Sequence, residues 1–199
     1  MLGGLIFSLR GTPIIDEGQE IGMTNGDFKS LGEIRDIESH NVDKMAKGLG
    51  IRNPWRWNLI RKTSRDNART PMQWTGGEGA GFTTGTPWLQ INKNHTAVNV
   101  ETDMASEDSV HAFYKRLIAF RKATDVLRFG NFSERFAKGS VYVFMREYEG
   151  KRLAACFNFS RKPCPIPTVF DGSVALCNYP GDTAADAPLR AWEYRLIAL

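Results

Sequence analysis

Apolar residues recur at helical spacing between residues 106 and 122. Gaps of three and four place one apolar stripe along a single helix face: Val110, Phe113, Tyr114, Leu117 and Ile118. Ser106 can cap the start of this segment, and Arg121 and Lys122 suit the negative end of a helix dipole. The pattern predicts a helix over residues 106–122 with one buried face.

After Asp125 the apolar period changes to two. Residues 140–146 and 153–159 alternate or run apolar around a Glu-Gly-Lys turn, which is typical of a β-hairpin. Two more short runs, residues 174–177 and 192–199, predict further strands. The pattern therefore indicates an antiparallel β domain over residues 125–199.

The first ten residues are apolar, and a turn then leads into a short β-branched run. We expect the end of a buried helix followed by a strand that is buried on both faces, as in a parallel sheet. The chain becomes polar at Asp16 and Glu17, where α/β folds place their sites. The apolar start lacks a basic leader and is shorter than the ~20 residues of a membrane span, so neither a signal peptide nor a membrane partner is expected.

Residues 21–107 show little periodicity, apart from a modest helical stretch near residues 34–47. A loop of this length either binds something or packs against structure outside this chain. Its most distinctive part is the polar loop of residues 64–74, with the sequence Ser-Arg-Asp-Asn-Ala-Arg-Thr-Pro-Met-Gln-Trp. Such a polar, proline-punctuated loop either binds a ligand or pins other loops. Aromatic residues nearby can stack on sugars, although ordinary loop packing would also place them there.

Composition narrows the classes of function. The chain has 199 residues, of which 42% are hydrophobic and 24% charged, as expected for a soluble globular protein. Its net charge of +4 is spread out, so no nucleic-acid partner is expected. Cys156, Cys164 and Cys177 form no close pair, which favours a reduced, cytoplasmic chain.

Candidate catalytic groups are sparse. Asp16 and Glu17 would point to opposite faces of a strand, so we expect these carboxylates to pin neighbouring loops instead of forming a dyad. A turn at Gly18 is the one way to bring Glu17 and Glu20 together. The histidines do not stand at ligand spacing, and there is no phosphate-binding loop or nucleophile elbow, so neither a metal nor a cofactor is expected.

Four motifs occur in order along the chain. Gly-Thr-Pro opens residues 11–25, Arg-Asp-Ile-Glu occupies 35–38, the polar loop follows, and Ala-Gly-Phe-Thr-Thr-Gly with Pro-Trp fills 80–88. Together they resemble the oligo-1,6-glucosidase group of α-glucosidases in the α-amylase superfamily, glycoside hydrolase family thirteen. The resemblance covers the whole chain, although Asp16 and Glu17 stand where that group has Tyr-Gln.

The resemblance implies an α/β plus β fold. Residues 1–124 would be the C-terminal portion of a (β/α)8 barrel, with strand eight at 12–16, a long loop, and helix eight at 107–122. Residues 125–199 would be an antiparallel β-sandwich domain. In this family the catalytic carboxylates lie on earlier barrel strands, and their motifs do not occur here, so the isolated chain is expected to be inactive.

Two positions match the family's substrate-binding residues. Arg65 matches an arginine that holds the glucosyl ring before the cleaved bond, and Glu38 an acid lining the subsite just beyond it. For each, the alternative is a structural role, which for Arg65 would be a loop-pinning ion pair. Asp66, Asn67 and Arg69 are expected to hold the loop in shape.

The leading hypothesis is a C-terminal fragment of a retaining α-glucosidase that cleaves α-1,6 or related bonds of short oligosaccharides. Its implied partners are a small oligosaccharide and the missing N-terminal barrel portion. The alternatives are a non-catalytic sugar-binding or structural β-domain protein and, within the family, a trehalose-6-phosphate hydrolase, a dextran glucosidase or an isomaltulose synthase.

Overall fold

The computed structural model describes residues 1–199, which form two compact units. One unit comprises residues 1–14 and 112–199, and is called the sheet unit below. The other comprises residues 15–111 and is called the loop unit. This division differs from the predicted boundary between residues 124 and 125, which stays a prediction about the domains of the family.

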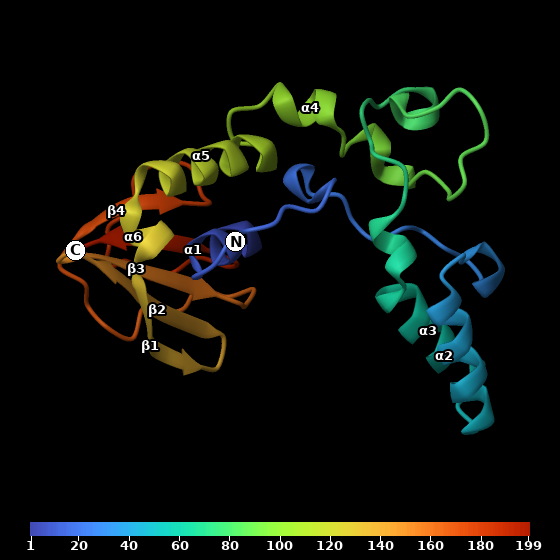
Figure 1. The fold of residues 1–199 in the computed structure, drawn as a ribbon, viewed down its shortest axis with the longest axis horizontal. Coiled ribbons are helices and arrows are strands. Elements are labelled where there is room, and N and C mark those ends of the chain that lie inside the picture. The colour runs from blue at the N-terminus through green and yellow to red at the C-terminus, as the bar shows by residue number, and fades with distance from the viewer. The chain divides into compact units, whose positions relative to one another are not determined.

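The sheet unit is built on one five-stranded antiparallel sheet (Figure 1). Its strands follow the order β1-β2-β3-β5-β4, with β1 and β4 at the edges. Their bounds are Asn131–Lys138 for β1, Val141–Tyr148 for β2, Lys151–Asn158 for β3, Ser173–Cys177 for β4 and Tyr194–Ala198 for β5. The predicted hairpin is confirmed as β2 and β3, which a two-residue turn at Glu149 and Gly150 joins. Strand β1 was not predicted.

Helices cover one face of this sheet. They are α1 (Leu2–Ser8), α6 (Asp125–Phe129) and α5 (Val110–Ala123), whose last twelve residues belong to this unit. The rings of Phe144, Phe157 and Tyr194 stack in a row across β2, β3 and β5, with centroids 5.6 Å and 5.2 Å apart. Phe113 of α5 meets Tyr194 edge-on at 6.2 Å. This row of rings forms the centre of the helix-covered core.

The predicted β-sandwich is wrong, because the opposite face of the sheet is covered by an irregular segment and not by a second sheet. Val143, Met145 and Ile197 lie there in a second apolar cluster, against which Ile166 and Phe170 pack. The segment that supplies Ile166 and Phe170 is irregular between residues 159 and 172, apart from an isolated bridge at Cys164. Its prolines, at positions 163, 165 and 167, remove backbone donors that a second sheet would need.

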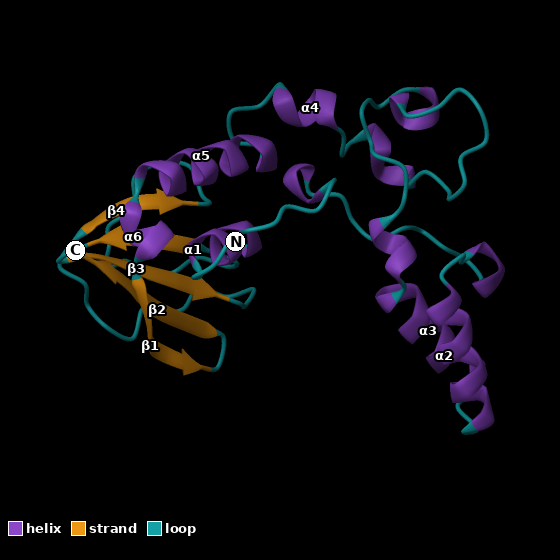
Figure 2. Cartoon of the chain, viewed as in Figure 1, coloured by secondary structure: helices purple, strands orange, loops and turns teal.

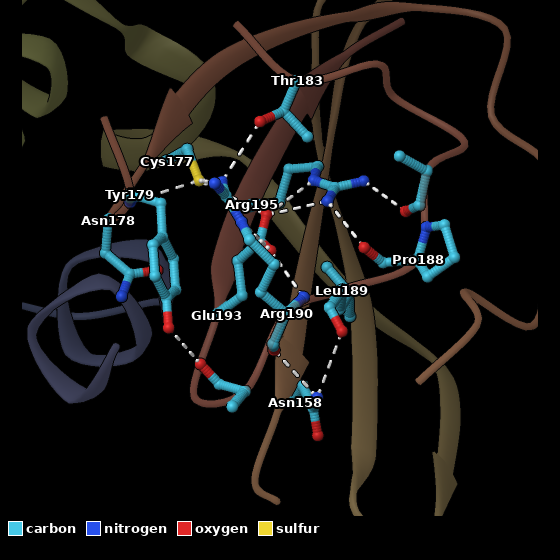
Figure 3. A network of polar contacts seen from close by, with 12 residues as sticks. Asn158, Cys177, Asn178, Tyr179, Thr183, Pro188, Leu189, Arg190, Glu193 and Arg195 are labelled. Atoms are coloured by element: carbon cyan, nitrogen blue, oxygen red, sulfur yellow. Dashed lines mark hydrogen bonds and ion pairs between the residues drawn. The ribbon is translucent and has the colours of Figure 1, made fainter. Parts of the chain in front are cut away.

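A buried polar network fixes the chain just before and within β5 (Figure 3). Glu193 and Arg195 are both fully buried, and their closest charged atoms are 2.8 Å apart. Arg195 also donates to the carbonyl oxygens of Ala187 and Pro188, while Arg190 pairs with Glu193 at 2.9 Å. Burial alone would raise the pKa of Glu193, but the hydrogen bonds from both arginines lower it. The network therefore holds the irregular segment just before β5 in place, while β5 itself also pairs with β3 and β4.

The start of the chain differs from its prediction. Helix α1 confirms a helix near the N-terminus, but residues 12–16 pair with no neighbour and form no strand. A strand depends on backbone bonds to a partner strand, and no segment of this chain provides one. Two buried arginines bond the carbonyl groups just before this segment: Arg121 donates to Leu9 at 3.2 Å, and Arg146 donates to Ser8 at 2.7 Å.

The loop unit contains helices and turns but no strand (Figure 2). Helices α2 (Ile37–Gly48) and α3 (Asn53–Thr63) pack together, and α4 (Val100–Met104) lies later in the chain. Helix α2 confirms the modest helical stretch near residues 34–47, whereas α3 and α4 were not predicted. Helix α5 begins at Val110 and not at residue 106, because Ser106 caps a separate turn by accepting from the Asp108 N–H.

Candidate functional site

The polar loop of residues 64–74 begins where helix α3 ends. The Ser64 hydroxyl accepts from the N–H of Asp66 at 3.3 Å and so caps a 3-10 turn over Arg65–Ala68. This is the ordinary capping role of serine, and it turns the chain sharply away from the helix. The turn exposes half of Arg65 while it buries Asp66 completely.

Asp66 ties the polar loop to the start of helix α2. Its Oδ2 accepts from the backbone N–H groups of Arg35 and Asp36, at 2.5 Å and 2.9 Å. Arg69 contacts the other oxygen of Asp66 at 3.4 Å. Asn67 adds a second link, since its Oδ1 accepts from the N–H of Gly26 at 3.0 Å. Asp66, Asn67 and Arg69 thus hold the loop in shape, as expected.

The two predicted substrate-binding residues lie side by side. The Arg65 guanidinium contacts Glu38 at 2.9 Å and Asp36 at 2.8 Å. Its Nε also donates to Asp36, so two guanidinium nitrogens bond one carboxylate oxygen. Side-chain exposure is 53% for Arg65 and 64% for Glu38, so neither side chain of the pair is buried. The ion pair is present; a contact with sugar stays a prediction.

Asp36 is the residue at this site that sequence reasoning missed. It is only 4% exposed, and it accepts hydrogen bonds from Ser39 at 2.8 Å and from Arg65. Burial alone would raise its pKa, but these bonds and the positive charge of Arg65 lower it to about 2. The signal was present in the sequence, where Asp36 stands between Arg35 and Glu38 in a polar run.

The acidic residues near the start of the loop unit form no dyad. Asp16 and Glu17 are exposed, and the Glu20 carboxylate accepts from the N–H of Gly18 at 2.8 Å. Glu17 instead lines a pocket of about 240 Å³ together with part of the polar loop. No group of three or more metal-ligating side chains occurs in the chain. No helix has the length and apolar character needed to cross a membrane.

Comparisons with known proteins agree on one family. The family model described as the alpha amylase catalytic domain matches residues 1–130. The chain is 38% identical to the probable oligo-1,6-glucosidase 2 of Bacillus subtilis over 209 residues, which covers 100% of this chain and 37% of that protein. It is 38% identical to the trehalose-6-phosphate hydrolase of Escherichia coli over 166 residues, covering 83% of this chain and 30% of that protein.

Solved structures give the same result. The isomaltulose synthase PalI of Klebsiella sp. LX3 matches with a TM-score of 0.91 at 30% identity, over 99% of this chain and 37% of that one. The trehalulose synthase MutB of Pseudomonas mesoacidophila MX-45 matches with a TM-score of 0.88 at 32% identity, over the same shares. The chain thus spans about a third of the length of these relatives. The chain belongs to the α-amylase family.

Proposed function

We propose that this chain is the C-terminal part of a retaining α-glucosidase that acts on α-1,6 or related bonds of short oligosaccharides. The oligo-1,6-glucosidase and its trehalose-6-phosphate-hydrolysing relative support this substrate class, because both names denote hydrolysis of small glucosides. We further propose that the chain works in a reducing compartment such as the cytoplasm. Its three cysteines, which are all free thiols, support that location.

The observation that carries the proposal is the half-exposed Arg65–Glu38 pair. Arg65 offers guanidinium donors and Glu38 offers carboxylate acceptors, and sugar hydroxyls can use both at once. Buried Asp36 fixes the direction of the guanidinium through its bonds to two nitrogens. Arg65 therefore has a structural role and a substrate-binding role together, and the two sequence-based alternatives do not exclude each other.

The catalytic carboxylates of this proposal belong to a part of the enzyme outside this sequence. The chain alone is then inactive toward isomaltose and p-nitrophenyl α-glucoside. A chimera offers the direct test, in which this chain replaces the matching third of the Bacillus subtilis relative. We expect the chimera to hydrolyse isomaltose.

Arg65→Ala in that chimera is expected to lower kcat/KM about 10-fold or more, because a charged hydrogen bond to substrate is lost. Arg61→Ala removes an exposed arginine that bonds only Asn58 through its side chain, and serves as the matched control. Arg65→Lys keeps a positive charge near Asp36. If this variant melts at the same temperature as the parent but has a lower kcat/KM, the defect lies in substrate binding and not in folding. Turnover by the isolated chain that is lost on Arg65→Ala would overturn the proposal.

A second candidate within the family is the isomerisation of a disaccharide. The trehalulose and isomaltulose synthase structures favour it, because they match the chain from end to end. Product analysis of the chimera after incubation with sucrose distinguishes the two candidates. Glucose and fructose alone indicate hydrolysis, whereas an isomeric disaccharide indicates a synthase.

A further inference from the structure

The sheet unit has a pocket of its own, on the sheet face opposite the helices. Its volume is about 420 Å³, within the range of about 300–1,000 Å³ that is typical of small-molecule sites. No residue of the polar loop lines it. The lining comes from strands β1, β2 and β3, from the irregular segment before β4 and from the residue after β5. The residues that decide its chemistry are Arg135, Met145, Arg152, Phe170, Asp171 and Leu199.

The inner part of this pocket is apolar. Met145 of β2 is only 5% exposed, and Phe170 and Leu199 are partly buried against the same apolar cluster. The Leu199 N–H donates to the backbone carbonyl of Arg152 at 3.1 Å, which holds Leu199 against β3. The apolar surface is therefore fixed by the sheet itself. A ligand with an apolar body is stabilised there, because it removes this surface from water.

The strand register places Arg152 beside this apolar surface. Met145 pairs with Ala154, and the two residues of a cross-strand pair lie on the same face of a sheet. Arg152 stands two residues before Ala154, so its side chain leaves the sheet on that face as well. Its guanidinium thus adds a positive charge at the β3 side of the pocket.

Arg135 lines the pocket from the other neighbour of β2. It occupies a bulge of β1, where the pairing with β2 shifts, and a bulge turns a side chain out of the regular alternation. Neither arginine side chain has a hydrogen bond or ion pair in the protein, not even with Asp171 or the carboxylate of Leu199. Both guanidinium groups therefore keep their donors free, and their forked geometry matches a carboxylate.

We propose that this pocket binds a small organic anion with an apolar body, such as an aryl carboxylate. Arg135 and Arg152 hold the acid group, while the Phe170 ring and the Met145 thioether contact the apolar body. A neutral sugar suits the pocket poorly, because an apolar surface leaves many of its hydroxyl groups without partners. The class of ligand therefore differs from the substrates proposed for the loop unit.

Nuclear magnetic resonance of the full chain, labelled with ¹³C at the methionine methyl groups, tests the proposal. The methyl signal of Met145, assigned by its loss in Met145→Leu, is expected to shift saturably when naphthylacetate is added. Naphthylacetamide has the same ring system without the charge, so we expect its dissociation constant to be about tenfold higher. The absence of a saturable shift with naphthylacetate, or equal affinity for the two compounds, would overturn the proposal.

Arginine variants locate the acid group of the ligand. Arg135→Gln and Arg152→Gln should each weaken naphthylacetate binding about fivefold or more, because each removes a charged hydrogen bond. Arg161→Gln removes the same charge from an exposed arginine outside the lining, and should leave the affinity unchanged. Unchanged affinity in both pocket variants, or an equal loss in Arg161→Gln, would refute the site. Arg135 and Arg152 are both exposed, so these variants are expected to melt like the parent chain.

Two further measurements test the apolar part of the pocket and the class of ligand. Phe170→Leu removes the ring but keeps an apolar side chain, so it should weaken naphthylacetate binding about fivefold while the melting temperature changes little. Isomaltose is expected to leave the Met145 methyl signal where it is. A saturable shift with isomaltose would make the pocket a carbohydrate site and would refute the proposal.

Discussion

The sheet unit and the loop unit are held together by different forces. In the sheet unit, apolar side chains fill both faces of one sheet, and Phe144, Phe157 and Tyr194 have no exposed surface. In the loop unit, the apolar cluster around Phe28 and Ile60 is small. The rest depends on polar side chains that bond loop backbone, such as Asp66, Asn67, Gln73 and Asn92. Apolar burial dominates the sheet unit, which also holds the buried Glu193–Arg195 pair, whereas the loop unit depends more on hydrogen bonds from side chains to backbone.

The largest expected effect is on the sheet unit. Phe157→Ala removes the central ring of the stacked row and leaves a cavity, which costs about 3–5 kcal/mol. Urea denaturation followed by hydrogen exchange of peptides from β2, β3 and β5 measures the loss. Phe132→Ala on the edge strand β1, where Phe132 is 39% exposed, should cost much less. Equal losses in the two variants would contradict a core centred on the ring row.

A smaller effect is expected when the loop unit loses its central carboxylate. Asp66→Ala leaves the N–H groups of Arg35 and Asp36 without their acceptor, at a cost of about 1–3 kcal/mol for each group that stays buried. Hydrogen exchange should quicken at these two amides. Asp27→Ala is the control, because Asp27 pairs with Lys29 on the surface, where such pairs contribute little to stability. If both variants cost the same, hydrogen bonding would not be what holds this unit.

This difference also explains which parts of the molecule the sequence could predict. The hairpin of β2 and β3 was predictable because two apolar runs flank a short Glu-Gly turn, and helix α5 because burial on one face leaves a period of 3.6. Asp66 and Asn92 bond backbone groups 31 and 67 residues away, and such contacts leave no period in the sequence. Helix α3 was missed for a related reason, since Ile60 is its one fully buried residue.

The candidate site was predictable in part. The motif resemblance singled out Arg65 and Glu38, which form an ion pair, but it did not reveal Asp36, the buried acid that also pairs with Arg65. It also could not show the pocket of the loop unit, because Glu17 and Thr70 are far apart in the sequence and meet only in the folded loop unit. Local sequence patterns do not encode which irregular segments come together in space.

The third test of the difference between the two units is the pH dependence of stability. Asp36 has an ordinary pKa of 3.8 and a pKa of about 2 in the folded chain. Its ion pair therefore stabilises the loop unit fully above about 3.8, and this contribution disappears as the pH falls through about 2. Asp36→Asn has no charge to lose, so the stability difference between it and the parent chain should shrink across this interval.

Urea midpoints measured at several pH values check this expectation. A difference that stays constant over the interval would show that Asp36 keeps an ordinary pKa when folded. Glu193 of the sheet unit also has a lowered pKa, so acid weakens both units. The comparison of two chains that differ only at Asp36 removes that contribution.

The smallest expected effect is a gain at the turn between β2 and β3. Glu149 has a φ of +49°, and Gly150 follows with a φ of +78°. Two-residue hairpin turns with both φ values positive prefer Asn-Gly, because asparagine tolerates the left-handed region better than glutamate does. Glu149→Asn should therefore stabilise the sheet unit by about 0.5–1 kcal/mol. Glu149→Gln removes the same charge without the backbone preference, so an equal gain there would assign the effect to charge.

The loop unit has the same backbone strain in opposite surroundings. Ala80 has a φ of +54°, but it is fully buried and its carbonyl accepts from the N–H groups of both Trp74 and Thr75. Ala80→Gly would relieve the strain and lose a buried methyl group, which is worth about 0.8 kcal/mol, so the two effects should nearly cancel. Urea midpoints for Glu149→Asn and Ala80→Gly thus compare one conformation on an exposed hairpin and in a buried polar turn. We expect a net gain in stability only at the hairpin. The side chain of Glu149 fills no buried space, so replacing it relieves the backbone strain without a loss of packing.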